Sequence, residues 1–302
     1  MSAQGIAGVV VLFHPDDLVI GNVSTYLSDL DALFVVDNTP EPDAALVASL
    51  RALPCVTYLP MGSNEGIARA LNVGAQAARE LGYEFLLTMD QDSRAFGGMV
   101  SSLARVMERE LRAGLISASQ LNERLGSGYE EVDTAITSGS LLRLAAWEDV
   151  GPFFESLFID LVDDEYCLRL AVAGYRVIKC YEALLLHRLG DWQQHRWFVI
   201  GRVGSPNHSA LRRYYIARNT AIVGDIYKNR FAQWWETQRM LRARELQLVA
   251  LFERDRFRKL ALARRGTRDA RASILGRYPD RLHDASAEIE EVRSTGKLTF
   301  RD

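Results

Sequence analysis

The sequence has few cysteines and no long apolar run. Cys55, Cys167 and Cys180 are far apart and form no C-x-x-C pair, so neither a disulfide framework nor a zinc cluster is predicted. No apolar run is long enough to cross a bilayer, and the N-terminus lacks the basic leader and cleavage site of a signal peptide. These absences predict a cytoplasmic protein in a reducing compartment.

Two classes of function are disfavoured by other absences. The formal net charge is -3, so no overall basic character supports nucleic-acid binding. A nicotinamide-dependent oxidoreductase needs G-x-G-x-x-G after its first strand, and "FHPDD" stands there instead. What the chain does contain, 302 residues with 48% hydrophobic and 25% charged, is enough for one large α/β domain with an appendage.

Short apolar runs alternate with helical patterns through the first half of the chain. This alternation predicts a parallel sheet with crossover helices, and its strands are "IAGVVVLF", "ALFVVDN", "CVTYLP" and "FLLTMD". Before the last of them, "NEGIARALNVGAQAARELG" predicts a helix that Ser63 or Asn64 caps and Gly82 ends.

The carboxyl ends of parallel strands meet at one edge of a sheet. Ligands of open α/β sheets bind at that edge. The residues that should converge there are His14, Asp37, Asn38, Asp90 and Asp92.

The second half of the chain has a mixed pattern. "LISASQL" and "VDTAITSGSLL" predict strands, and "LAAWEDVG" predicts a short helix closed by Gly151. "VDDEYCLRLAVAGYRVIKC" predicts a helix followed by a strand, and "HSALRRYYIARNTAIVGDIY" a further helix. Beyond Asp225 the chain is expected to be helical, with a polar, frayed end.

Asp90 and Asp92 raise the first question of chemistry. Side chains two residues apart on an extended chain point the same way, so two anions would share a small space. Water, a shared proton or a cation could stabilise them, and solvated turn carboxylates are the alternative. Since the pair ends a buried strand, a ligand role is favoured, and oxygen ligands suit Mg²⁺ or Mn²⁺.

A second acidic group lies in "FIDLVDDEYCLRL". Acids stabilise a helix N-terminus through its dipole, so capping alone is one interpretation. Crowding could instead raise one pKa toward values that suit a general base. The sequence leaves both open for Asp160, Asp163, Asp164 and Glu165.

Two further motifs have weaker signals. His187 ends the run "LLLH"; a lone histidine is usually structural, but a nearby carboxylate metal site makes it a candidate ligand. In "LRRYYIARN" the arginines and tyrosines would suit a diphosphate and sugar hydroxyls, or form the solvated face of an amphipathic helix.

Taken in order along about Ile6 to Tyr227, these motifs resemble family 2 glycosyltransferases of the GT-A fold. More narrowly, they resemble bacterial rhamnosyltransferases that use dTDP-L-rhamnose. The resemblance implies a Rossmann-like mixed sheet flanked by helices, with a C-terminal helical appendage. It implies a catalytic domain over 1–224, with a nucleotide-binding half of about 1–113 and an acceptor half of about 114–224. A basic amphipathic helical segment, 225–283, and a flexible tail, 284–302, would follow.

The same resemblance implies roles for individual residues. His14 and Pro15 would border the nucleotide base, Asp37 would meet the base or ribose, and Asn64 with Gly66 would line the nucleotide site. Asp90 and Asp92 match the metal-binding motif that holds Mg²⁺ or Mn²⁺ against the donor diphosphate. His187 would complete the metal site, and the arginines that would assist the diphosphate are Arg212, Arg213 and Arg218.

The base is implied by the match of "VDDEYCLR" to the family's E-D-x-D-x-C-x-R. Asp163 takes the position of the catalytic base and Glu165 that of the following acid. Val162 replaces the first acid of the usual pair, so Asp164 and Asp160 remain alternatives.

The predicted function is inverting, metal-dependent transfer of L-rhamnose from dTDP-L-rhamnose to a cell-surface polysaccharide or a lipid-linked glycan precursor. The alternatives are a UDP-linked donor such as galactofuranose on the same fold, and a non-catalytic sugar-nucleotide binder or scaffold. Retention of Asp90, Asp92, Asp163 and His187 together argues against a decayed site.

The C-terminal segment has a local charge bias. Between Asp225 and Arg281, lysine and arginine outnumber acids by about two to one. "RFRKLALARR" has the character of an interfacial helix, which would place the enzyme at the inner face of the cell membrane. Helix packing against protein is the alternative, and a homo-oligomer stays open.

Overall fold

The computed structural model describes residues 5–121, 126–187, 193–197, 201–205 and 207–300. The chain divides into two compact units. The first comprises Met1–Glu155, Val162–Arg188 and Gly296–Asp302, and the second comprises Ser156–Leu161 and Leu189–Thr295.

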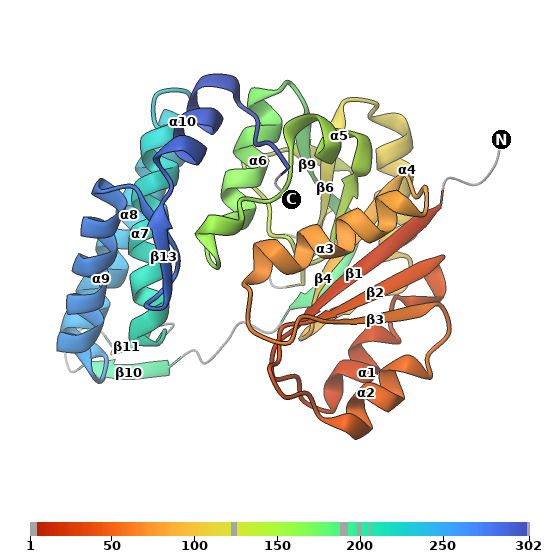
Figure 1. Cartoon of the computed structure of the whole chain (residues 1–302), viewed down its shortest axis with the longest axis horizontal. Coiled ribbons are helices and arrows are strands. Elements are labelled where there is room, and N and C mark those ends of the chain that lie inside the picture. The colour runs from red at the N-terminus through yellow and green to blue at the C-terminus, as the bar shows by residue number, and fades with distance from the viewer. Residues whose placement is uncertain (1–4, 122–125, 188–192, 198–200, 206, 301–302) are drawn as a thin grey trace. The chain divides into compact units, whose positions relative to one another are not determined.

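A mixed sheet forms the centre of the first unit (Figure 1). Four parallel strands come first, in the spatial order β3 (Val56–Pro60), β2 (Ala32–Asp37), β1 (Ile6–Leu12) and β4 (Phe85–Asp90). β8 (Ser140–Arg143) then runs antiparallel to both β4 and β6 (Ala113–Gln120). Next come β9 (Arg176–His187), parallel to β6, and the short strands β5 (Ser93–Ala95) and β7 (Tyr129–Glu131), both antiparallel to β9. The predicted mixed α/β sheet is confirmed.

Helices cover both faces of this sheet because side chains alternate along each strand. Val10 and Leu12 of β1 join one buried cluster with residues of α1 (Leu18–Val23), α2 (Ala44–Arg51) and α4 (Met99–Arg109). On the opposite face Val9 meets α3 (Ile67–Glu80), where a Cβ added to Gly74 would lie 2.3 Å from Val9 Cγ2. α5 (Leu144–Val150) and α6 (Val162–Val172) complete the helices of this unit.

The start of α3 differs from the prediction. The helix begins at Ile67, and its N-cap is Gly66 at φ 88°, with no side-chain cap. Asn64 instead accepts a hydrogen bond from the Gly66 backbone N–H, so Ser63 and Asn64 lie in the loop before the helix. Gly82, at φ 80°, follows the helix end as predicted.

The strand predicted over "VDTAITSGSLL" is mostly wrong. Only the last residues, from Ser140, join the sheet as β8. Gly139 has φ 74° and its N–H donates to the Thr88 carbonyl, while Ser140 N–H donates to the Thr137 carbonyl. This tight turn interrupts the strand and brings Ser138 to the end of β4.

The second unit consists mainly of three helices, α7 (Ala210–Tyr227), α8 (Ala232–Phe252) and α9 (Arg256–Arg271). α7 and α9 approach closely at Gly266, where an added Cβ would lie 2.3 Å from the Tyr214 carbonyl oxygen. Two hairpins were not predicted: β10 (Gln193–Trp197) with β11 (Gly201–Ser205), and β12 (Ile274–Arg277) with β13 (Arg281–Asp284).

The predicted helical segment, 225–283, ends in the β12–β13 hairpin because residues within the hairpin disfavour a helix. Gly276 has φ 94°, and Pro279 lacks the N–H that a helix would need. Within 284–302, where the sequence predicts a flexible tail, α10 (Ser286–Thr295) buries Ile289 and Val292. Across the described residues, no helix combines the length and apolarity needed to cross a membrane.

Candidate active site

The carboxyl edge of the parallel strands is tied together by side-chain amides. Asn38, directly after β2, donates from Nδ2 to the Gly66 carbonyl at 3.1 Å and accepts the Glu65 N–H at 3.2 Å. Asn38 is buried, so this link holds the loop before α3 against the end of β2. Asn64 and Gly66 therefore lie beside the edge where the sequence predicts a nucleotide site.

Gln91 performs a similar role between β4 and β1. Its Oε1 accepts the Phe13 N–H at 2.8 Å, and its Nε2 donates to the Phe13 carbonyl at 3.2 Å. Asn22 of α1 donates to the Gln91 carbonyl at 2.8 Å. The middle residue of "DQD" thus fixes the loop that carries His14 next to the two aspartates.

Asp90, Asp92 and His187 form one cluster in the first unit. One ligand atom from each lies within 4.8 Å of the others, and all three residues are partly exposed. His187 Nδ1 is 3.5 Å from Asp92 Oδ1. The pairing of Ser93 with His187 in the β5–β9 register brings the histidine to the aspartates. Two carboxylates and an imidazole fit Mn²⁺ and Mg²⁺, which leave further positions for phosphate oxygens.

Two buried serines connect the members of this cluster. The Asp90 N–H donates to Ser138 Oγ at 3.1 Å, Ser138 Oγ donates to Ser93 Oγ at 2.7 Å, and Ser93 Oγ lies 2.8 Å from His187 Nδ1. Ser93 and Ser138 are 0% and 1% exposed. Nothing in the sequence pattern assigns a role to either serine. A hydrogen-bonded partner of this kind fixes the ring orientation of a metal-binding histidine.

Loss of the Ser93 hydroxyl should therefore weaken metal binding. In Ser93→Ala the His187 ring loses its hydrogen bond, and the Kd for Mn²⁺ should rise about tenfold. Titration of Mn²⁺ followed by electron paramagnetic resonance measures this constant. Ser101→Ala, on the exposed face of α4, is the matched control and should leave the Kd unchanged. An unchanged Kd in Ser93→Ala would show that the serines do not position the histidine.

Two neighbouring hollows share His14. One, of about 190 Å³, is lined by His14, Pro15, Asp37 and residues up to Leu50. The other, of about 100 Å³, is lined by His14, Gln91 and Asp92, with residues of the loop and helix after β1. Three of the predicted nucleotide-site residues therefore line one hollow, and His14 connects it to the cluster.

Asp37 is held firmly within this edge. The Tyr58 hydroxyl donates to Asp37 Oδ2 at 2.7 Å, and the Thr39 N–H donates to Oδ1 at 2.8 Å. Burial and this hydrogen bond to the Asp37 carboxylate raise the pKa of Tyr58. Asp37 is 2% exposed. Any contact with a base or ribose would therefore use the carboxylate lone pairs that are not already bonded to Tyr58 and Thr39.

The acidic group at the start of α6 separates into members with different surroundings. Asp163 and Asp164 are partly exposed in the first turn. Glu165 is fully buried, and its two oxygens accept hydrogen bonds from Arg169 at 3.0 and 2.9 Å. Arg169 also donates to the carbonyls of Val150 and Pro152. We propose that Glu165 anchors α6 instead of contacting a substrate.

The buried pair predicts a large effect on stability. In Glu165→Gln the Arg169 guanidinium keeps its charge without a carboxylate, so the free energy of unfolding should fall by about 3 kcal/mol or more. Urea unfolding followed by circular dichroism measures it. Glu290→Gln removes an exposed partner of Arg293 and should cost less than about 1 kcal/mol. Equal losses in the two variants would contradict the anchoring role.

Asp160 lies in the second unit and is engaged there. Its carboxylate accepts hydrogen bonds from Arg212 at 3.0 and 3.1 Å, while burial raises its pKa. Asn219 donates to the carbonyls of Leu157, Ile159 and Asp160, which holds this segment in its left-handed conformation, φ 64° at Asp160. This engagement favours Asp163 or Asp164 as the base.

Two of the three predicted diphosphate arginines are buried within the second unit. Arg218 donates to the carbonyls of Gly276 and Leu157 and packs against the rings of Tyr214 and Tyr215. Arg213 pairs with Glu245 and Glu253. We propose structural roles for both, because their charges are already directed at protein groups. Arg212, 48% exposed at its side chain, keeps the most access to solvent.

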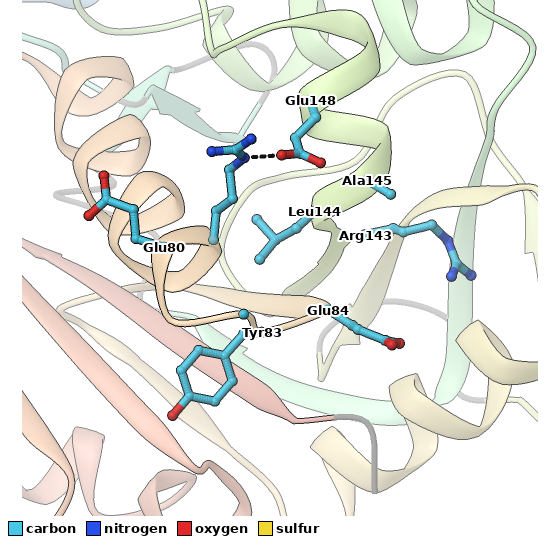
Figure 2. A pocket seen from close by; sticks show the side chains of 9 residues that line it. Glu80, Tyr83, Glu84, Arg143, Leu144, Ala145 and Glu148 are labelled. Atoms are coloured by element: carbon cyan, nitrogen blue, oxygen red, sulfur yellow. Dashed lines mark hydrogen bonds and ion pairs between the residues drawn. The ribbon is translucent and has the colours of Figure 1, made fainter. Parts of the chain in front are cut away.

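A cavity of about 570 Å³ lies at the opposite, amino end of β4 (Figure 2). Glu80, Tyr83, Glu84, Arg143 and Glu148 line it, as Figure 2 shows. Arg79, which also lines it, forms an ion pair with Glu148. None of the predicted site residues contributes to it. It lies at the amino edge of the parallel strands, away from Asp90, Asp92 and His187 at the carboxyl edge, where ligands of such sheets bind.

Comparison with known proteins agrees with this fold. The family described as glycosyl transferase family 2 matches residues 20–145. The dTDP-rhamnosyl transferase RfbF of Shigella flexneri is 30% identical over 242 residues, which cover 73% of this chain and 80% of the relative.

Two solved structures share the fold at low sequence identity. The first, GalNAc-T7 with UDP, GalNAc and Mn²⁺, has a TM-score of 0.60 and 10% identity; the match covers 78% of this chain and 50% of that one. The second, residues 1–349 of S. aureus TarS, has a TM-score of 0.59 and 12% identity; the match covers 88% of this chain and 80% of that one. The fold is therefore the GT-A fold, as expected from the sequence.

The fold and these relationships define a glycosyltransferase. The chain belongs to glycosyltransferase family 2. Within that family it is similar to the dTDP-rhamnosyl transferase of Shigella flexneri, as the order of its motifs predicted.

Proposed function

We propose that this glycosyltransferase moves L-rhamnose from dTDP-L-rhamnose to a hydroxyl of a cell-surface polysaccharide or lipid-linked glycan precursor, with inversion. The observation that carries the proposal is the cluster of Asp90, Asp92 and His187 at the carboxyl edge of the sheet. The donor is inferred from the name of one relative, the dTDP-rhamnosyl transferase of Shigella flexneri, whose match covers most of both chains.

Asp90, Asp92 and His187 would hold Mg²⁺ or Mn²⁺. When bound, such an ion stabilises the negative charge that develops on a departing diphosphate. The two carboxylates supply anionic oxygens, and the serine chain from Asp90 to His187 keeps the imidazole turned toward them. Such a role would account for the two aspartates, Asp90 and Asp92, at the end of a buried strand.

The nucleotide would occupy the hollow beside His14. Pro15 and Leu46 supply apolar surface there, and Asp37 supplies acceptor oxygens for a base or ribose. Because Gln91 fastens the loop at Phe13 to β4, a nucleotide against His14 has its diphosphate near the aspartates.

Asp163 is the proposed general base. It lies partly exposed in the first turn of α6, where the buried Glu165–Arg169 pair fixes the helix. Asp163 takes the proton of an acceptor hydroxyl as that oxygen attacks the anomeric carbon of rhamnose. The new carbon–oxygen bond forms on the face opposite the nucleotide, the bond to the diphosphate breaks, and dTDP leaves with the electron pair.

A panel of sugar nucleotides tests this function. Purified protein is incubated with dTDP-L-rhamnose, dTDP-glucose, UDP-galactofuranose and UDP-glucose, each with Mn²⁺, with Mg²⁺ or with EDTA. Binding is measured by calorimetry and slow donor hydrolysis by release of nucleoside diphosphate. We expect metal-dependent selection of dTDP-L-rhamnose. Selection of a UDP-sugar would overturn the donor, and no binding with either metal would overturn the transferase function.

A further inference from the structure

Helix α9 of the second unit has two sides with different surroundings. Lys259, Ala263, Gly266 and Ala270 are buried, and their spacing of four, three and four residues places them on one side of the helix. That side packs against α7 at Gly266. Lys259 is used there as well, since its Nζ donates to Glu253 Oε2 at 2.8 Å. Packing against protein therefore accounts for one side of α9 only.

The opposite side of α9 carries an aromatic ring that is open to solvent. Phe257, Ala261, Arg264 and Arg268 repeat the spacing of the buried residues, and all four are exposed. Phe257 is 80% exposed, and Leu251, at the adjoining end of α8, is 57% exposed. A ring in water gains free energy when an apolar phase covers it. We call these four residues of α9 its outer side.

The charges around this outer side are almost all positive. Residues 254–271 contain eight basic and two acidic side chains. One of the acids, Asp269, is buried and pairs with Arg265, which leaves Asp255 as the exposed acid of this stretch. Arg256 lies over the Phe257 ring, with its Cζ 5.5 Å from the ring centroid.

Several exposed arginines of this stretch are available to an anionic partner. Within the described part of the chain, no ion pair is formed by Arg254, Arg256, Arg258, Arg264 or Arg268. This distinguishes them from Arg213 and Arg218, whose charges are directed at protein groups. Guanidinium groups bind phosphate oxygens strongly, so phosphates next to an apolar phase would satisfy both the arginines and Phe257.

We propose that the outer side of α9 binds the surface of a bilayer that contains anionic phospholipids. The arginines would contact lipid phosphates, and Phe257 would enter the boundary between the headgroups and the acyl chains. This is the usual arrangement of a basic helix at a membrane interface. The inference is independent of the sugar donor and of the reaction.

Two other partners fit this surface less well. A second copy of the same surface would bring arginines against arginines, and like charges across an interface are unfavourable. Single-stranded nucleic acid could stack a base on Phe257, but the formal net charge of the chain is -3, which does not favour a polyanion. An anionic bilayer is a polyanion only at its surface and also offers hydrocarbon.

Sedimentation of the full chain with vesicles tests the proposal. Vesicles of phosphatidylcholine with about 30% phosphatidylglycerol are compared with vesicles of phosphatidylcholine alone. The partition coefficient should be at least about tenfold higher on the anionic vesicles. It should fall as NaCl is raised from about 0.1 M to about 0.5 M, because salt screens the attraction.

Two variants separate the apolar and the charged contributions. Phe257→Ala should lower the partition coefficient at least about tenfold. Arg264→Gln with Arg268→Gln should lower it about 25-fold, or about fivefold for each charge near the surface. All three side chains are exposed, so the thermal midpoint of the free protein should stay within about 2 °C of the wild type.

The matched control removes the same kinds of side chain from the first unit. Arg109 and Leu111 are both exposed, Leu111 to 79%. Arg109→Gln with Leu111→Ser should therefore bind anionic vesicles as the wild type does.

Several results would overturn the proposal. These are no binding to either kind of vesicle, equal binding to both kinds, and binding that Phe257→Ala and the double arginine variant leave unchanged. Without vesicle binding, single-stranded RNA that binds through Arg264 and Arg268 would assign the surface to nucleic acid instead. A dimer that Phe257→Ala disrupts, again without vesicle binding, would assign it to a second copy of the chain.

Discussion

Asp163→Asn should lower kcat for rhamnosyl transfer by about 10³-fold, within the 10²- to 10⁴-fold range of general-base catalysis. The amide cannot accept the proton of the acceptor hydroxyl, but it preserves the size of the side chain in the first turn of α6. The Kd for the donor in the presence of Mn²⁺ should stay within about threefold of the wild type, because the metal cluster is intact. Release of dTDP with a saturating acceptor measures kcat.

Asp164→Asn is the matched control for this variant. Asp164 has the same partial exposure and is one residue away, and its variant should retain more than about a tenth of wild-type kcat. The Asp164 backbone N–H donates to Asp163 Oδ1 at 3.0 Å. The side-chain oxygen in Asp163→Asn can still accept this hydrogen bond, and Asp164→Asn leaves its donor unchanged. A larger loss in Asp164→Asn than in Asp163→Asn would contradict the assignment of the base.

Asp92→Ala should have the second large effect, a loss of metal-dependent donor binding and a fall in transfer of about 10³-fold. Removal of one carboxylate leaves Asp90 and His187 as ligands and lowers the affinity for the ion. The Kd for Mn²⁺, measured by electron paramagnetic resonance, should rise at least about a hundredfold. Excess Mn²⁺ should restore part of the activity.

Asp17→Ala controls for the loss of a negative charge near this edge. Asp17 is exposed at the start of α1 and makes no side-chain cap bond. Transfer by this variant should stay within about threefold of the wild type. Activity of Asp92→Ala that equals that of Asp17→Ala, with or without EDTA, would contradict the role of the cluster in catalysis.

The strands and the position of the two aspartates could be predicted because their signals are local. Apolar runs that end in polar residues place those residues at one edge of a parallel sheet, and His14, Asp37 and Asp90 do lie at or just after the ends of β1, β2 and β4 there. His187 needed more, since its partner across the β5–β9 pairing is Ser93. The expected carboxylate site made His187 a candidate ligand, and the resemblance to a family supported it, but no local pattern pairs these two distant segments.

The supporting contacts could not be predicted for physical reasons. Ser138 reaches the end of β4 because Gly139 turns the chain at φ 74°, and the same turn broke the predicted strand. The sequence also does not indicate whether an arginine is buried. The motif around Arg218 suits a phosphate ligand, but in the structure Arg218 is buried and donates to the carbonyls of Gly276 and Leu157. Such positions depend on tertiary packing, not on local pattern.

The central claim is that Asp90, Asp92 and His187 hold a divalent ion against the donor diphosphate. Pulsed electron paramagnetic resonance of Mn²⁺ with dTDP-L-rhamnose tests it most directly. An ion held by these three residues should show a ¹⁴N coupling from the imidazole, lost in His187→Ala, together with ³¹P couplings from the diphosphate, both abolished in Asp92→Ala. Bound Mn²⁺ with ³¹P couplings but no ¹⁴N coupling, unaffected by Asp92→Ala, would place the ion elsewhere and contradict its binding by Asp90, Asp92 and His187.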